Sequence, residues 1–284
     1  MQQGTCFPRP FATRMTDKVA ERSLPYWHVD AFAARPFTGN PAAVMILDAW
    51  LDDSVLQSIA EENNFAETAF LVRDTSGAAD WELRWFTPAV EIGLCGHATL
   101  ASGHVLLGKD RAAQSVRFRT RKAGVLEVVR HGDAYELALP AINTEAADYP
   151  EAVAALGAKP LEIWRNPDRY NLFIYEDEAQ VRALQPDFRA LAALGGDSFA
   201  VTAPGTATDV VSRVFVPGAG VDEDSVTGSA HAVLTPYWAT RLGRDSFTAY
   251  QASLRGGHLT CRLDGDLVWL GGGCVTVVAG RFYL

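Results

Sequence analysis

Two segments of this 284-residue chain share a glycine start, a histidine and an apolar body. The first runs from Gly96 to Gly108 and carries no formal charge when its histidines are neutral, and the second begins at Gly228. If each forms a helix, its glycine lets the backbone approach a ligand, and its first turn offers unpaired N–H groups at the positive end of the helix dipole. Two such ends facing each other would hold a substrate carboxylate and stabilise the negative charge that develops when a neighbouring C–H bond loses its proton.

For a single segment of this kind, tight packing of small residues in a core is the better explanation. The repetition of the feature favours the anion site. His97 directly follows the first glycine, so it lies at the start of the expected helix. His104 and His231 lie inside the apolar bodies and are expected to be core histidines with satisfied hydrogen bonds.

The positions of the two segments predict the architecture. Each lies late in its half of the chain and follows a strand-rich stretch, which indicates an internal duplication. The run at 81–86 is typical of the strands, with Trp81, Leu83 and Trp85 on one face. Because a helix without a polar face belongs inside a domain, we expect an α+β fold of two pseudo-symmetric halves. Each half should be a curved, mostly antiparallel, barrel-like sheet around a central helix.

The same pattern predicts the domain boundaries. We expect an N-terminal extension at 1–23, a first domain at 24–114 and a second domain at 115–284, with the C-terminal strands able to pack back on the first domain. The extension has no apolar segment of the kind that a secretory signal requires.

Two helix details also follow from the sequence. The segment from Ser54 to Gln57 reads as a capping box that begins a short amphipathic helix. The face toward the sheet should contain Val55, Leu56, Ile59 and Ala60. Pro236 removes an internal hydrogen bond from the second central helix. We therefore expect that helix to be kinked or shorter than its partner.

The composition excludes several classes of protein. The chain is 48% hydrophobic and 21% charged, as globular proteins are, and its net charge of −9 leaves no basic surplus for binding nucleic acid. The longest apolar runs are shorter than the ~20 residues that span a bilayer, so no membrane association is expected. Four cysteines without a CxxC pair fit a reducing, cytoplasmic setting. The sequence has no HExxH, P-loop or Rossmann glycine pattern, so we expect neither a metal nor another cofactor.

Four blocks resemble those of a known family. They are PFTGNPAAV at 36–44, NNFAETAFL at 63–71, IGLCGHATLA at 92–101 and EDSVTGSAHA at 223–232. In this order and spacing they are similar to the PhzF-like (phenazine biosynthesis) family, which has the diaminopimelate-epimerase fold. The resemblance extends from Tyr26 to Leu284.

This resemblance implies a cofactor-independent isomerase that moves a proton along a small carboxylate-bearing substrate. The family's best-known member does so on a dihydro-hydroxyanthranilate, and its members commonly form homodimers.

The family pattern also implies residue roles. Glu67 matches the general acid/base, and His97 and Asp224 match its polar partners. Three residues match the positions that bind the substrate carboxylate: Gly96, Gly228 and Ser229. The family usually has proline where this chain has Ser225, an exchange expected to loosen the Asp224 loop.

Two other functions remain open at this stage. A non-catalytic binding or scaffold protein would retain the fold and its cleft, although intact Glu67, His97 and Asp224 argue against it. A cysteine-dependent racemase or epimerase would use Cys95, whose pKa a helix N-terminus lowers. That mechanism needs a second thiol, and the matching part of the second half, Asp224 to Thr227, has none.

Overall fold

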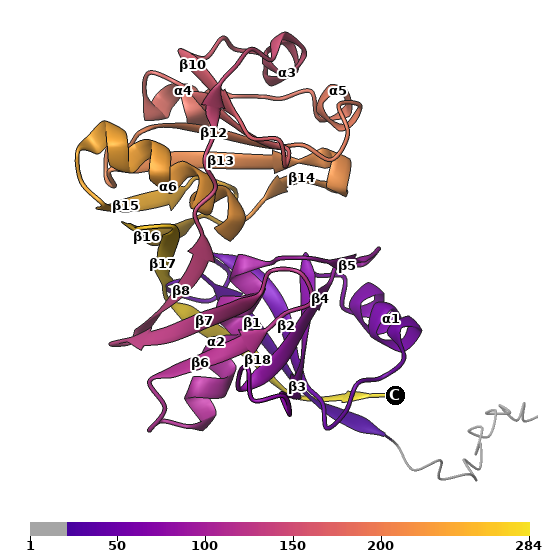
Figure 1. Ribbon diagram of the computed structural model, residues 1–284. Coiled ribbons are helices and arrows are strands. Elements are labelled where there is room, and N and C mark those ends of the chain that lie inside the picture. The colour runs from indigo at the N-terminus through magenta and orange to yellow at the C-terminus, as the bar shows by residue number, and fades with distance from the viewer. Residues whose placement is uncertain (1–21) are drawn as a thin grey trace, which may run out of the picture.

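A computed structural model describes residues 22–284 as two halves stacked on each other (Figure 1). Of the N-terminal extension expected at 1–23, only Arg22 and Ser23 lie within the described residues. Cys6 lies outside them. The first half contains β1 (Ser23–Ala31), β2 (Asn40–Ile46), α1 (Asp53–Asn63), β3 (Glu67–Arg73), β4 (Trp81–Phe86), β5 (Glu91–Ile92), α2 (Gly96–Lys109), β6 (Ser115–Arg119), β7 (Val125–His131), β8 (Ala134–Pro140) and β18 (Cys274–Tyr283).

The second half contains the remaining elements. They are β9 (Glu145–Ala146), α3 (Pro150–Leu156), β10 (Glu162–Arg165), β11 (Tyr170–Ile174), α4 (Glu178–Ala183), α5 (Phe188–Ala192), β12 (Ser198–Pro204), β13 (Val210–Val216), a 3₁₀ turn (Pro217–Ala219), β14 (Val221–Asp224), α6 (Gly228–Leu242), β15 (Ser246–Gln251), β16 (Gly257–Asp264) and β17 (Leu267–Gly272).

The order of strand pairing is the same in both halves. In the first half β1–β2 is antiparallel, β2–β3 parallel, β3–β4 and β4–β5 antiparallel, β4–β6 parallel, and β6–β7 and β7–β8 antiparallel. The same sequence of pairings runs through β10, β11, β12, β13, β14, β15, β16 and β17. This repetition confirms the predicted duplication and the α+β fold class. An antiparallel pairing of β8 with β17 joins the two sheets.

The structure moves the boundary between the halves. Strands β6, β7 and β8 pack against α2, so they belong to the first half, which continues to Pro140. The expected boundary after residue 114 is therefore wrong, because the strands that follow the central helix complete the sheet around it. β18 returns to the first half and pairs with β1 from Ser23↔Tyr283 to Ala31↔Cys274.

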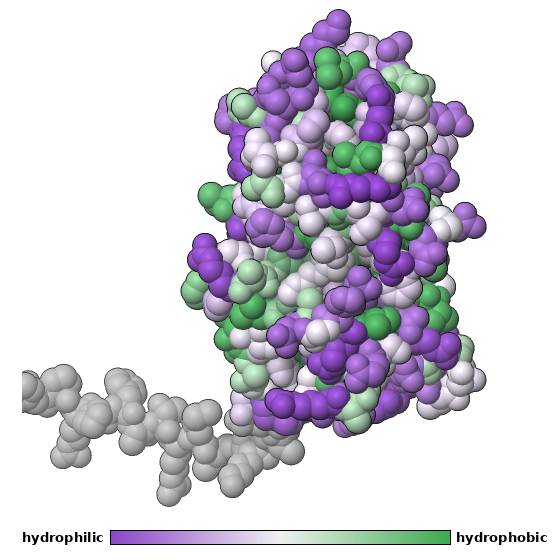
Figure 2. Space-filling model, turned by 90° about the vertical axis from the view of Figure 1, so that its left-hand side faces the viewer, coloured by the Kyte–Doolittle hydropathy of each residue, from purple (hydrophilic) through white to green (hydrophobic). Residues whose placement is uncertain are grey.

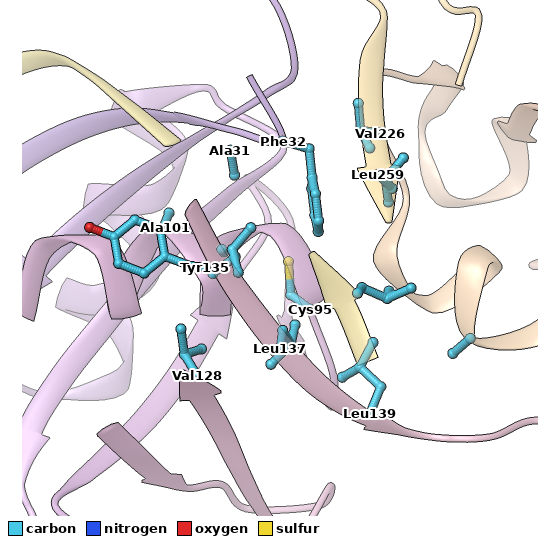
Figure 3. Close-up of a cluster of buried hydrophobic side chains, with 14 of the residues drawn as sticks. Ala31, Phe32, Cys95, Ala101, Val128, Tyr135, Leu137, Leu139, Val226 and Leu259 are labelled. Atoms are coloured by element: carbon cyan, nitrogen blue, oxygen red, sulfur yellow. The ribbon is translucent and has the colours of Figure 1, made fainter. Parts of the chain in front are cut away.

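The central helix of the first half lies inside its sheet, as its lack of a polar face predicts. Nearly every residue of α2 from Gly96 to Leu107 is buried. Gly103 lies so close to β7 that an added Cβ would be 2.4 Å from Val128 Cγ1, so only glycine fits there. The core is continuous between the halves: Phe32 and Cys95 lie in one buried cluster with Val226 and Leu259 (Figure 3).

Two expected helix details differ in the structure. Helix α1 buries Leu56, Ile59 and Ala60 as expected and Val55 in part, but it begins at Asp53 after Asp52, without a side-chain cap, so Ser54 is not the N-cap. Helix α6 spans 15 residues and is not shorter than α2, which spans 14.

The length of α6 has a local explanation. Pro236 cannot donate a hydrogen bond to the carbonyl four residues earlier, which belongs to Ala232. The backbone N–H of Ile142, in the connection between the halves, donates to that carbonyl instead at 3.2 Å. The helix therefore continues past the proline without an unsatisfied acceptor.

On the face shown in Figure 2, hydrophobic residues are scattered among hydrophilic ones. None of the helices in the described part of the chain is long and apolar enough to cross a membrane.

Candidate active site

The N-termini of α2 and α6 meet at the interface between the halves. A Cβ atom placed on Gly96 would lie 2.9 Å from Gly228 Cα, and one placed on Gly228 would lie 3.0 Å from Gly96 Cα. The structure thus brings the two predicted helix starts together. Their first-turn N–H groups and positive dipole ends lie at one place.

The alternation of side chains along β3 points Glu67 toward the meeting point of the α2 and α6 N-termini. Ala69 and Leu71 of β3 lie in the core cluster around α2, so Glu67, two residues earlier, is on the same inward face. Asn40 begins the neighbouring strand β2 and shares the inward face of Ala42. His97 is the second residue of α2.

Glu67 and His97 form a close charged contact. Glu67 Oε2 lies 3.0 Å from His97 Nε2, and the two side chains are 16% and 5% exposed. Both atoms are buried, and neither has an aligned hydrogen bond to another described residue. Desolvation alone would lower the pKa of His97, but Cys95 and Glu67 outweigh it, so the pKa is raised well above 6.5. This direction favours the protonated form of His97 beside the Glu67 side chain.

Cys95 lies on the other side of the His97 ring. Its Sγ is 3.5 Å from His97 Nδ1. Burial raises the pKa of this thiol to about 11, which reverses the expected effect of the helix N-terminus. The donor atoms of Glu67, Cys95 and His97 lie within 4.8 Å of one another. However, Glu67 contacts Nε2 of His97 and Cys95 contacts Nδ1 of the same ring. A metal ion would be bound by only one of these two nitrogens, so this arrangement does not suit one.

The second half contributes Asp224. Its Oδ2 accepts a hydrogen bond from Thr227 Oγ1 at 2.5 Å, and its Oδ1 accepts one from Asn40 Nδ2 at 2.8 Å. Desolvation raises the pKa of Asp224, and the Glu67 carboxylate adds to this effect, while His97 and the two hydrogen bonds oppose it. The site thus combines the Glu67–His97 contact from the first half with a carboxyl group from the second half whose pKa is raised.

Asn40 connects the two halves of the site, and sequence reasoning did not select it. Besides Asp224, its Nδ2 donates to the backbone oxygen of Val226 at 2.9 Å and lies 3.2 Å from His97 Nδ1. Asn40 is 1% exposed. A signal was present, since Asn40 lies in the block at 36–44, but only the spatial arrangement shows what its amide contacts.

The loop that carries Asp224 is held from behind by Gln251, which is fully buried. Gln251 Nε2 donates to the backbone oxygen of Asp224 at 2.8 Å, and Gln251 Oε1 accepts from the backbone N–H of Thr227 at 2.8 Å. Ser253 Oγ donates to the backbone oxygen of Ser225 at 2.7 Å. The expected loosening at Ser225 is therefore not seen, and nothing in the sequence around Gln251 indicated its role.

The sequence also singled out Ser229 and the two histidines inside the central helices. Ser229 is the second residue of α6, is partly exposed, and its hydroxyl has no hydrogen-bond partner among the described residues. His104 contacts Tyr135 Oη at 3.2 Å and Thr276 Oγ1 at 2.8 Å. His231 contacts the backbone oxygen of Thr227 at 2.8 Å. His231 is thus a buried core residue with a partner, as expected, whereas His104 has partners but is only partly buried.

Comparison with known proteins places this geometry in a family. The family model described as phenazine biosynthesis-like protein (PhzC-PhzF) matches residues 29–280. The chain belongs to this family. An uncharacterized isomerase of Pseudomonas aeruginosa is 49% identical over 263 residues, covering 92% of this chain and 99% of the relative. A phenazine biosynthesis-like domain-containing protein of Homo sapiens is 37% identical, covering 90% and 98%.

Solved structures agree with this assignment. A PhzF-family protein of Enterococcus faecalis has 44% sequence identity and a TM-score of 0.85, covering 93% of this chain and 100% of that chain. A hydroxyproline epimerase of Agrobacterium vitis has 13% identity and a TM-score of 0.61, so it shows the shared fold alone. The fold of this PhzF-family chain is therefore of the isomerase and epimerase type.

Proposed function

We propose that the chain is a cofactor-independent isomerase that moves a proton between two carbons of a small carboxylate-bearing substrate. The observation that carries the proposal is the 3.0 Å contact of Glu67 with His97, at the point where the α2 and α6 N-termini meet. A carboxylate that contacts a buried histidine at a fixed distance is held in one orientation and can accept a proton from a carbon placed beside it.

The reaction proceeds in two proton transfers. Glu67 accepts a proton from a substrate carbon next to a C=C bond, and the electron pair of the broken C–H bond is delocalised over that C=C bond and the carboxylate, so the double bond shifts when a second carbon is protonated. The first-turn N–H groups of α2 and α6 stabilise this negative charge. Glu67, now protonated, returns the proton to a different carbon. Atoms and charge balance without an added group.

Substrate binding depends on the two helix starts. The backbone N–H groups at Gly96 and Gly228 and the unpartnered Ser229 hydroxyl are suited to a carboxylate. Asp224, with its raised pKa, faces the same place and orients the substrate by a hydrogen bond.

We also propose that the enzyme is a cytoplasmic homodimer. Among the described residues β18 pairs only with β1, which leaves its other edge unpaired along ten residues, with Val278 46% and Tyr283 62% exposed. Such an edge favours pairing with a second copy. Cys95, Cys261 and Cys274 form no disulfide within the described chain, which fits a reducing compartment.

The alternative mechanism through Cys95 has less support. A two-thiol racemase needs a second thiol across the site, but the N-cap of α6 is Thr227, in the position that Cys95 takes in α2. A binding protein without catalysis has less support because Glu67, His97 and Asp224 are all present and lie together.

The test is a screen for solvent deuterium incorporation into small cyclic carboxylates and amino acids, read by mass spectrometry. We expect at least one to gain deuterium at carbon with the wild-type protein. No exchange in any carboxylate, with the protein folded, would favour the binding function.

A further inference from the structure

A strand hairpin precedes each active-site helix along the chain, β4–β5 before α2 and β13–β14 before α6. Both hairpins contain an arginine–glutamate ion pair. In the first half, Arg84 Nε and Nη2 donate to Glu91 Oε1 and Oε2, both at 2.8 Å, which joins β4 to β5. In the second half, Arg213 Nε and Nη2 donate to Glu223 Oε1 and Oε2 at 2.8 and 2.9 Å, which joins β13 to β14. The same atoms thus pair in equivalent hairpins.

The surroundings of the two arginines are duplicated as well. The guanidinium carbon of Arg84 lies 5.0 Å from the ring centre of Phe86, and that of Arg213 lies 5.0 Å from the ring centre of Phe215. The arginine side chains are only 3% and 11% exposed. Because a planar guanidinium binds a carboxylate at two points, each pair fixes both the spacing and the orientation of its hairpin.

The pair of the second half is connected to the body of that half. Arg213 Nη1 also donates to the backbone oxygens of Leu184 at 2.9 Å and Val181 at 3.2 Å, at the end of α4. Glu223 is therefore held to a fixed point rather than to a flexible side chain.

This attachment bears on Asp224, which directly follows Glu223. The register of β13 with β14 shifts between Val214 and Val216, so the attachment of Glu223, rather than regular strand alternation, limits where the next residue, Asp224, can lie. Asp224 also pairs with Val214 in the β13–β14 ladder, one residue from Arg213. The position of its carboxyl group beside Asn40 thus depends on the hairpin that Arg213 holds.

We propose that the Arg213–Glu223 pair, duplicated as Arg84–Glu91, is a positioning clamp that sets the aim of Asp224 into the active site. The inference deepens the proposed function, because it assigns a role to a pair that does not itself touch the site. It predicts that Asp224 changes its surroundings when the clamp is loosened, although the clamp residues contact neither its carboxyl group nor Asn40.

The experiment uses Glu223→Gln and Arg213→Lys, which keep the side-chain size or the charge but lose the two-point pair. Arg241→Lys is the matched control: Arg241 pairs with Glu162 in the same half, at the end of α6 away from Gly228. Circular dichroism first establishes that each variant is folded.

The readout is a carboxyl ¹³C NMR titration of Asp224 in the labelled full-length protein, assigned with Asp224→Asn. We expect its pKa to fall back toward the ordinary value in both clamp variants and to stay unchanged in Arg241→Lys. If a substrate has been found, its kcat should fall on the order of 10²-fold, as for a misplaced catalytic group, with KM changing less.

An Asp224 titration identical to wild type in a folded clamp variant would overturn the proposal, and if one variant does not fold, the other decides. The double variant Arg213→Glu with Glu223→Arg should restore the wild-type titration at least in part. Because the titration needs no substrate, failure of the proposed isomerase function leaves this test valid.

Discussion

Gly96 and Gly228 touch through their backbones, with an added Cβ on Gly96 only 2.9 Å from Gly228 Cα. The contact joins two helices that are 132 positions apart in the chain but equivalent in the duplicated fold. It leaves the first-turn N–H groups of both helices at one place. The absence of side chains at these two positions is therefore a condition for the shared site.

We predict that Gly96→Ala destabilises the protein by about 1–3 kcal/mol, because its methyl group would meet the Gly228 backbone, which cannot move aside as a flexible side chain would. Gly108→Ala in the same helix is the control, since nothing lies within 4 Å of its added Cβ. The control should be neutral or stabilising by up to about 1 kcal/mol. Urea unfolding measures both, and equal effects of the two substitutions would contradict the contact.

Asn40→Ala should lower the free energy of unfolding by about 1–3 kcal/mol, because Asp224 loses a hydrogen-bond donor inside the interface. Asn63→Ala is the control, since Asn63 is the last residue of α1 and, among the described residues, its side chain bonds only to Thr68 Oγ1. The substitution should also weaken any proton exchange. Unchanged stability and exchange in Asn40→Ala would show that this amide does not hold the site together.

The stability of the protein should fall in mild acid because of His231. Burial lowers the pKa of His231 to about 4, whereas the unfolded chain has the ordinary value near 6.5. Between these two pH values the unfolded state therefore binds a proton at His231, whereas the folded state does not. The contribution is complete above pH 6.5 and is lost as the pH falls toward 4, by about 3 kcal/mol in all.

His231→Gln tests this acid dependence. Urea unfolding of wild type and variant is compared at about pH 7 and pH 4.5. The variant should lose less stability between the two than wild type does. Equal losses would mean that other groups cause the acid sensitivity.

The sequence predicted the parts of the fold that repeat. Helices without a polar face, as at Gly96–Gly108, can only be buried, and strands of alternating polarity can only wrap them. The predicted boundary after residue 114 was wrong because the sequences of β6, β7 and β8 are like those of strands in either half. Which half they join depends on long-range strand pairing. Helix α6 is not shortened at Pro236, because the N–H of Ile142, a partner from another segment, satisfies the freed carbonyl.

The site was predicted where the residues lie in the four sequence blocks. Glu67, His97 and Asp224 come together as expected. Gln251 was missed because a glutamine at the end of a strand looks like any other, and only its contacts with the Asp224 loop distinguish it. The reactivity of Cys95 was misjudged because sequence shows the helix start but not the burial that raises the thiol pKa.

Cys95 should therefore react slowly with iodoacetamide. A pKa of about 11 rather than 9 leaves on the order of 10²-fold less thiolate at pH 7, before its burial is considered. Mass spectrometry of the folded and the urea-unfolded protein measures the rate at this cysteine. Rapid modification in the folded state would indicate an activated thiol and favour the racemase mechanism.

The central claim is that Glu67 carries the proton. Glu67→Gln keeps the size of the side chain and its hydrogen bonding but cannot accept a proton. Binding should be largely unaffected, because Gly96, Gly228 and Ser229 hold the carboxylate in the proposal. Cys95→Ala is the comparison variant, since it removes the thiol that the racemase mechanism needs and leaves Glu67 in place.

The decisive measurement is the rate of solvent deuterium incorporation into a carboxylate that the wild-type protein accepts. General acid/base catalysis contributes ~10²–10⁴ in rate, so Glu67→Gln should slow exchange by at least ~10²-fold, while Cys95→Ala, which leaves the proton acceptor in place, should slow it much less. Unaltered exchange in Glu67→Gln, or its abolition by Cys95→Ala alone, would contradict the account and move the catalytic role to the thiol.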